Sequence, residues 1–322
     1  MGVSIMDKIS LIIPCYNEEE SIPILYNELD RISNIMNYVE FGFFFIDDGS
    51  TDNTLTLLKK FNSNDSRVKY ISFSRNFGKE SAMYAGLSYV DGDYVAILDA
   101  DMQDPPSLLP RLYQTIKQGD YNSVATRRIT RAGEPRFRTI CAKVFYKIMR
   151  KISKTNIVDG SRDFRLMDRK FVNSILSLKE FNRFTKGMYN WVGFKTTCIE
   201  YENVKRCAGK TKWSFIGLLT YSLEGIISYS TVPLIITSLI GLFFFILSLL
   251  FIIFIIFRQM IYHNSANGWA SMTCIILLIG GIQLFSIGII GQYLSQIYLE
   301  IKGRPHFIIN ETNVNVDKNV KK

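Results

Sequence analysis

The amino-acid sequence predicts an α/β domain with a mostly parallel, Rossmann-like sheet, followed by two membrane-spanning helices. Over residues 1–212, short apolar runs alternate with charged, helix-compatible segments, and the runs end in polar loops rich in small residues. This alternation is typical of doubly wound α/β domains. Two later segments, 232–257 and 272–294, contain no charged residue.

The expected strands are short apolar runs, as buried parallel strands usually are. They are Ile9–Ile13, Phe41–Ile46, Val68–Ser72 and Tyr94–Leu98, with a further strand around Ser123–Ala125. The first helix is expected from about Ser21. Because ligands of such sheets bind beyond the carboxyl ends of the strands, the loops after the first four strands form the candidate site.

The loop after the fourth strand carries the clearest chemical signal. Asp99 and Asp101 are two residues apart, so on extended backbone their side chains point the same way. Two such carboxylates suit a hard divalent cation that in turn holds phosphate oxygens. The alternative is an acidic turn closed by Pro105-Pro106. The sequence contains neither G-x-G-x-x-G nor a Walker A motif, which excludes a dinucleotide fingerprint or a P-loop as the phosphate-binding element.

Each uncharged segment exceeds the roughly 20 residues that cross a bilayer core. Cations precede the first uncharged segment and follow the second, namely Arg206, Lys210, Lys212, Lys302 and Arg304. The connecting loop has only Arg258 and His263, so both termini are expected in the cytoplasm. Residues 232–299 are therefore expected to form two transmembrane helices, and residues 300–322 a basic cytoplasmic tail.

Two further segments are expected at the membrane surface. Residues 136–153 place apolar side chains on one helical face and basic ones on the other; an ordinary surface helix is the alternative. Residues 213–231 are rich in aromatic side chains and carry only Glu224 as a charge. This placement of cations argues against nucleic acid as the reason for the net charge of +9. The five scattered cysteines suggest reduced cytosolic thiols.

Longer motifs carry a resemblance to a known family. The segments Ile13-Pro14-x-Tyr16-Asn17-Glu18-Glu19, Asp47-Asp48-Gly49-Ser50-x-Asp52 and Asp99-x-Asp101 resemble family 2 glycosyltransferases with the GT-A fold. Further segments resemble the bactoprenol (undecaprenyl phosphate) glucosyltransferases, relatives of dolichyl-phosphate mannose synthase. These are Arg75–Glu80, Asp163–Arg169, Lys186-Gly187-x-x-x-Trp191-Val192-Gly193 and Gly209-Lys210-Thr211-Lys212-Trp213. The resemblance extends over nearly the whole chain.

The resemblance implies a role for each of several residues. The donor nucleotide would contact Pro14, Tyr16, Glu18, Asp48, Arg75, Lys79 and Asp99. Mg²⁺ or Mn²⁺ would be held by Asp99, Asp101 and Gln103. The acceptor phosphate would contact Arg127, Arg128, Arg206 and Lys212. Asp163 would be the catalytic carboxylate together with Asp101, with Asp159 as a competitor. Taken singly, each of these residues also suits a turn, a helix cap or the lipid surface.

Asp163 need not be a strong base, because a phosphate monoester acceptor has a second pKa near 6. Ser161-Arg162 precedes it where relatives commonly have a small residue or glycine.

The resemblance implies an inverting transfer of glucose from UDP-glucose to undecaprenyl phosphate, giving undecaprenyl phosphate β-glucose for surface glycans. The protein would be a multi-pass homotetramer of the bacterial cytoplasmic membrane. A flippase and an extracellular or periplasmic glycosyltransferase would use its product. Galactose, N-acetylglucosamine, mannose and a modified pentose are alternative sugars. A non-catalytic membrane scaffold and a processive polysaccharide synthase are alternative functions, the latter disfavoured because the chain lacks Gln-x-x-Arg-Trp.

Overall fold

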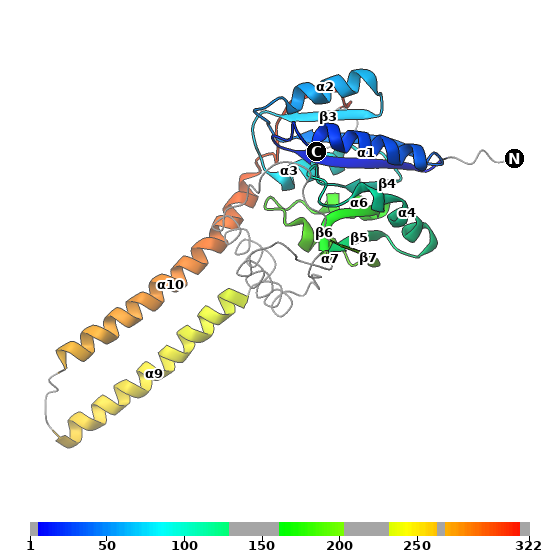
Figure 1. The fold of residues 1–322 in the computed structure, drawn as a ribbon. Coiled ribbons are helices and arrows are strands. Elements are labelled where there is room, and N and C mark those ends of the chain that lie inside the picture. The colour runs from blue at the N-terminus through cyan, green and yellow to red at the C-terminus, as the bar shows by residue number, and fades with distance from the viewer. Residues whose placement is uncertain (1–5, 129–160, 203–231, 263–267, 316–322) are drawn as a thin grey trace.

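The structure is a computed structural model that describes residues 6–128, 161–202, 232–262 and 268–315. Figure 1 shows an α/β domain from which two long helices extend side by side. The predicted surface segments 136–153 and 213–231 lie outside the described residues.

One mixed sheet organises the domain. Its strands are β1 (Lys8–Cys15), β2 (Glu40–Asp47), β3 (Val68–Phe73), β4 (Tyr94–Ile97), β5 (Ser123–Arg128), β6 (Ser161–Asp168), β7 (Thr196–Tyr201) and β8 (Ile309–Thr312). They are ordered β7-β5-β6-β4-β1-β2-β3-β8. The four strands β4, β1, β2 and β3 are parallel, which confirms the predicted α/β fold and aligns their carboxyl ends along one edge.

Helices cover both faces of this sheet, so alternate side chains of β2 are buried on opposite sides. The helices of the domain are α1 (Ile22–Ile35), α2 (Thr54–Asn64), α3 (Lys79–Tyr89), η1 (Pro106–Leu108), α4 (Leu109–Gln118), α6 (Arg169–Ser177) and α7 (Thr185–Trp191). Phe43 packs in the core beneath α1 and α4, whereas Phe44 packs in the core beneath α3 and α6. Helix α3 lies close to β1, since a Cβ on Gly86 would sit 2.3 Å from Cγ2 of Ile12.

Of the strands beyond β4, the sequence predicted β5, around Ser123–Ala125, but not β6 or β7. β6 pairs antiparallel with both β4 and β5, and β7 lies beyond β5. These strands carry charged residues that lower their resemblance to apolar runs. Arg165, for example, is buried in β6 with its guanidinium 3.5 Å from the ring centre of Tyr189. Tertiary partners of this kind make a polar strand acceptable in a core.

The prediction of a tail over residues 300–322 is wrong for its first half. Residues 309–312 form β8, which pairs antiparallel with β3, and the ring of Phe307 stacks 5.0 Å from that of Phe73. The backbone N–H of Tyr70 also donates to Oδ1 of Asn313 at 2.7 Å. The segment becomes a strand because β3 offers an unpaired edge, which four mostly polar residues do not reveal by themselves.

The two remaining helices are α9 (Val232–Tyr262) and α10 (Trp269–Lys302), and they contain the two uncharged segments. Among the described residues, one helical segment, Leu278–Lys302, is long and apolar enough to cross a membrane. A shorter apolar stretch spans Leu234–Phe244 in α9. The prediction of two transmembrane helices therefore stays a prediction. The domain-side end of α10 contacts the α/β domain, where Glu300 accepts the N–H of Phe181 at 2.8 Å.

Candidate functional site

The loops after β1 and β2 are hydrogen-bonded to each other. The N–H of Asn17 donates to Oγ of Ser50 at 2.9 Å, and the N–H of Thr51 donates to Oδ1 of Asn17 at 2.8 Å. Asn17 takes a φ of 52°, a left-handed conformation that asparagine tolerates better than most residues. The predicted nucleotide residues Pro14, Tyr16 and Glu18 lie at this junction, Pro14 within β1 and the other two just after it. The loops thus form one connected surface at the carboxyl edge of the sheet.

Asp48 joins this surface to the loop after β3. Its carboxylate accepts the N–H of Phe77 at 2.6 Å and the N–H of Gly78 at 2.9 Å. Burial raises the pKa of Asp48 to about 6, although these two N–H groups oppose that rise. Gly49 has a φ of +68°, and a Cβ there would meet the backbone of Arg75 at 2.4 Å. Asp48 therefore supports the β3–α3 loop, and its predicted contact with the donor nucleotide stays a prediction.

Asp99, Asp163 and Lys79 meet at the centre of the site. Ile97 of β4 pairs with Arg165 of β6, so continuing this antiparallel register brings Asp99 opposite Asp163. Nζ of Lys79 lies 2.6 Å from Oδ1 of Asp99 and 2.7 Å from Oδ2 of Asp163. Three residues that are far apart in the sequence thus form one ion-paired group.

The charges in this group control its ionisation. Burial by itself lowers the pKa of Lys79, but the carboxylates of Asp163 and Asp99 raise it above its ordinary value. Burial by itself raises the pKa of Asp163, but the ammonium groups of Lys79 and Lys186 hold it well below its ordinary value. Nζ of Lys186 lies 3.9 Å from Oδ1 of Asp163. Asp163 is accordingly an ionised carboxylate that holds two cations.

A second cluster supports the loop after β4, and the sequence did not reveal it. Asp104 is fully buried and accepts Nε–H of Arg162 at 2.9 Å and the hydroxyl of Tyr201. Arg162 also donates to Oε1 of Gln103 at 3.3 Å. Asp101 accepts the N–H of Gln103 at 3.1 Å. Arg162 thereby links β6 to the predicted metal-binding loop. Ser161-Arg162 departs from the small residue or glycine that relatives commonly have before Asp163, and this departure was the one signal in the sequence that could have pointed to the cluster.

Asp99, Asp101 and Gln103 supply hard oxygen atoms, the ligands that Mg²⁺ and Mn²⁺ prefer. Mg²⁺ usually binds one or two carboxylates and completes its shell with water and substrate phosphates. The described part of the chain contains no group of three or more His, Cys, Asp or Glu side chains that could hold a metal. The ammonium of Lys79 on Asp99 shows that this carboxylate already attracts a cation. The residues therefore fit a metal that is shared with a phosphate ligand.

The predicted acceptor residues are described only in part. Arg127 and Arg128 end β5 at the same edge as Asp99, and Nη1 of Arg127 lies 3.4 Å from Oε1 of Glu200. The side chain of Arg127 is 43% exposed, so it is accessible to a ligand. Arg75 is exposed, with its guanidinium 4.0 Å from the ring centre of Phe77. Arg206, Lys212 and Asp159 lie outside the described residues.

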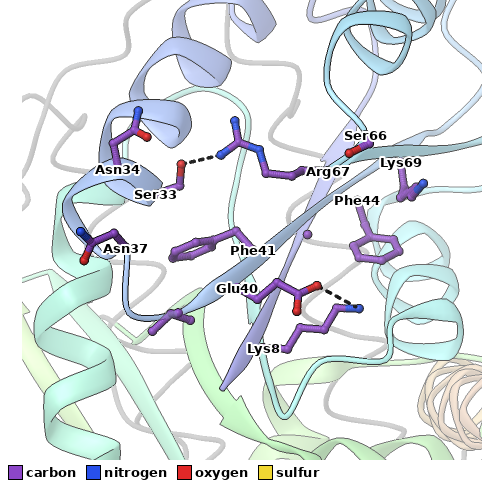
Figure 2. A pocket seen from close by; sticks show the side chains of 12 residues that line it. Lys8, Ser33, Asn34, Asn37, Glu40, Phe41, Phe44, Ser66, Arg67 and Lys69 are labelled. Atoms are coloured by element: carbon purple, nitrogen blue, oxygen red, sulfur yellow. Dashed lines mark hydrogen bonds and ion pairs between the residues drawn. The ribbon is translucent and has the colours of Figure 1, made fainter. Parts of the chain in front are cut away.

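A separate groove lies at the amino-terminal ends of β2 and β3, away from this edge (Figure 2). Two of its three cations, Lys8 and Arg67, are paired with acids. Nζ of Lys8 lies 3.1 Å from Oδ1 of Asp91, and Nη2 of Arg67 lies 2.8 Å from Oδ2 of Asp65. These ion pairs reduce the positive charge that the groove presents to an anionic ligand.

Residues 10–176 match the family described as Glycosyl transferase family 2. The chain belongs to this family. This glycosyltransferase is 41% identical over 302 residues to the bactoprenol glucosyl transferase of Shigella phage SfX, covering 94% of this chain and 98% of the relative. It is 40% identical over 306 residues to the putative glycosyltransferase CsbB of Bacillus subtilis (strain 168), covering 95% and 92%.

A third relative is the prophage bactoprenol glucosyl transferase homolog of Escherichia coli (strain K12), 39% identical with 94% of this chain and 98% of the relative covered. Among solved structures, the glycosyltransferase is similar to glucosyl-3-phosphoglycerate synthase from Mycobacterium tuberculosis in complex with Mn²⁺, UDP and glucosyl-3-phosphoglycerate. That match has a TM-score of 0.48 and 18% identity, and covers 69% of this chain and 78% of the other.

Proposed function

We propose that this glycosyltransferase moves glucose from UDP-glucose to undecaprenyl phosphate, with inversion at the anomeric carbon. The observation that carries the proposal is the near full-length similarity to bactoprenol glucosyl transferases. The meeting of Asp99, Asp163 and Lys79 at one sheet edge supports it, because the proposed transfer joins two charged substrates and needs charged side chains where they meet. The product would be undecaprenyl phosphate β-glucose.

Inversion follows from a single displacement. An oxygen of the lipid phosphate attacks the anomeric carbon, the bond to the diphosphate breaks, and UDP leaves from the opposite side. The attacking phosphate carries close to two negative charges at neutral pH, so it has no proton that a strong base must remove. A carboxylate that orients the acceptor without removing a proton is therefore sufficient. Asp163 suits this role, because two ammonium groups hold it ionised and make it a weak base.

Asp99, Asp101 and Gln103 would hold Mg²⁺ or Mn²⁺. The metal would act as a Lewis acid that stabilises the charge of the departing diphosphate. Pro14, Tyr16, Glu18 and Asp48 would line the nucleoside pocket. Arg75 would approach the diphosphate as a cation.

The acceptor phosphate would be bound by Arg127 and Arg128 at the end of β5, with Arg206 and Lys212 nearer the membrane. Two like-charged substrates must be brought together, so cations on the acceptor side are required. The exposed guanidinium of Arg127 supports this assignment.

The protein would lie in the bacterial cytoplasmic membrane with both termini in the cytoplasm, and with α9 and α10 as its two spans. The largely exposed apolar side chains of both helices support membrane insertion. Residues 136–153 and 213–231 would lie at the lipid surface. The chain would assemble as a homotetramer, and a flippase and an external glycosyltransferase would use its product.

The test is a transfer assay with the purified full chain in detergent. Undecaprenyl phosphate, Mn²⁺ or Mg²⁺ and one of a panel of radiolabelled UDP-sugars are mixed, and label entering the organic phase is counted. We expect label from UDP-glucose that is lost with EDTA. Label from UDP-galactose or UDP-N-acetylglucosamine instead would replace the sugar but keep the reaction. Absence of label from every donor would refute the proposed reaction.

A further inference from the structure

Lys79 is ion-paired with a residue that the proposed function gives to the metal. Its Nζ lies 2.6 Å from Oδ1 of Asp99, a direct contact between an ammonium and a carboxylate. A metal on that carboxylate would lie next to this ammonium, and two cations repel each other at such a distance. The metal and the ammonium of Lys79 therefore cannot share the carboxylate of Asp99 without weakening the binding of the metal.

The fold fixes the position of this ammonium. Lys79 is the first residue of α3 and follows Gly78, which has a φ of 96° and donates its N–H to Asp48. The next residue, Glu80, accepts the hydroxyl of Thr185 in α7. The backbone of Lys79 is thus anchored on both sides. Its second contact, 2.7 Å to Oδ2 of Asp163, keeps the ammonium at the centre of the site.

We propose that Lys79 holds Asp99 in the unloaded enzyme and releases it to the metal only when a nucleoside diphosphate arrives. This inference rests on the proposed function, because it takes Asp99 as a metal ligand. The diphosphate carries the negative charge that compensates the displaced ammonium, while Asp163 keeps Lys79 in the site. Metal alone therefore binds weakly, and metal and nucleotide strengthen each other's binding.

Lys186 provides a matched comparison. It is a second ammonium beside Asp163, at 3.9 Å from Oδ1, and its removal leaves the ion pair between Lys79 and Asp99 in place. Loss of either lysine removes one positive charge from the same cluster. A difference between the two variants therefore reports the contact with Asp99 rather than the general field.

The experiment measures Mn²⁺ binding, by the electron paramagnetic resonance signal of free Mn²⁺, for the purified full chain in detergent with and without UDP. We expect Lys79→Met to bind Mn²⁺ without UDP about ten-fold more tightly than wild type, a typical coupling between sites. UDP should strengthen Mn²⁺ binding less in Lys79→Met than in wild type. Lys186→Met should stay close to wild type in both measurements.

A Mn²⁺ affinity of Lys79→Met equal to or weaker than that of wild type would overturn the inference. An equal gain in Lys186→Met would also overturn it. Lys79→Gln is measured in parallel as a smaller change that keeps a polar side chain, and thermal unfolding identifies which variants are folded. The transfer assay is run on the wild-type protein beside the Mn²⁺ binding measurements. Metal-dependent transfer with unchanged Mn²⁺ affinity in the lysine variants refutes only this inference, whereas absence of transfer refutes the proposed function as well.

Discussion

Replacing Asp104 with alanine tests whether the buried cluster behind the loop after β4 stabilises the domain. Asp104 has 0% exposure and is bonded to Arg162 and Tyr201. The change leaves a guanidinium and a hydroxyl without their acceptor. The pKa of Asp104 is raised by burial, whereas the charge of Arg162 opposes that rise. The ionised form of Asp104 is therefore stabilised by the charge of Arg162.

The magnitude follows from burial. Breaking a buried ion pair by removing one partner costs about 3 to 5 kcal/mol. The side chain of Arg162 is 25% exposed, so water partly compensates it and the lower end applies. The lost bond from Tyr201 adds about 1 kcal/mol. We expect a loss of about 4 kcal/mol, or a fall in melting temperature of about 10 °C for a domain of this size.

The assay is thermal unfolding of the full chain in detergent, followed by tryptophan fluorescence. Tyr201→Phe is the control and should lose only about 1 kcal/mol, because it removes one hydroxyl. Asp104→Ala combined with Arg162→Met should recover much of the loss, because no buried charge is left unpaired. A melting temperature for Asp104→Ala no lower than for Tyr201→Phe would refute the reasoning, as would a double variant that falls by the sum of both singles.

Three further predictions concern the site. Asp101→Ala should lower transfer by about 100-fold or more while the melting temperature stays near that of wild type, since it removes a proposed metal ligand but little of the core; retained transfer would contradict the metal assignment. Arg127→Ala should raise the KM for the lipid phosphate several-fold and leave the KM for the UDP-sugar unchanged; equal effects on both would move the acceptor site elsewhere. The pKa of Asp48 is about 6 in the folded protein against an ordinary 3.8, so its stabilising contribution is present at low pH and is lost as pH rises through about 6. The free energy of unfolding should be about 1.4 kcal/mol higher at pH 5 than at pH 7.5 in wild type, and Asp48→Asn should lack this difference. An equal difference between the two pH values in both proteins would exclude Asp48 as its source.

The sequence predicted the parallel half of the sheet well, because each of its strands is buried on both faces and therefore apolar. Val68–Ser72 and Tyr94–Leu98, for example, differ by one residue from β3 and β4. Strands β6 and β7 were not predicted, because their charged residues, such as Arg162 of β6, have partners that are distant in the sequence. A local pattern cannot reveal a partner 58 residues away.

The sequence by itself determined the fold class, the family and the edge of the sheet at which the acidic residues gather, since these follow from local hydrophobic pattern and from motifs. Only the tertiary structure decided which charges meet. Lys79 was expected at the donor nucleotide, and the fold pairs it with Asp99 and Asp163 because the register of β4 and β6 brings those two carboxylates together beside the start of α3. The same holds for residues 309–312, which become a strand because β3 has an unpaired edge within reach of the end of α10. Pairing of distant charges and strands depends on three-dimensional distance, which local pattern does not contain.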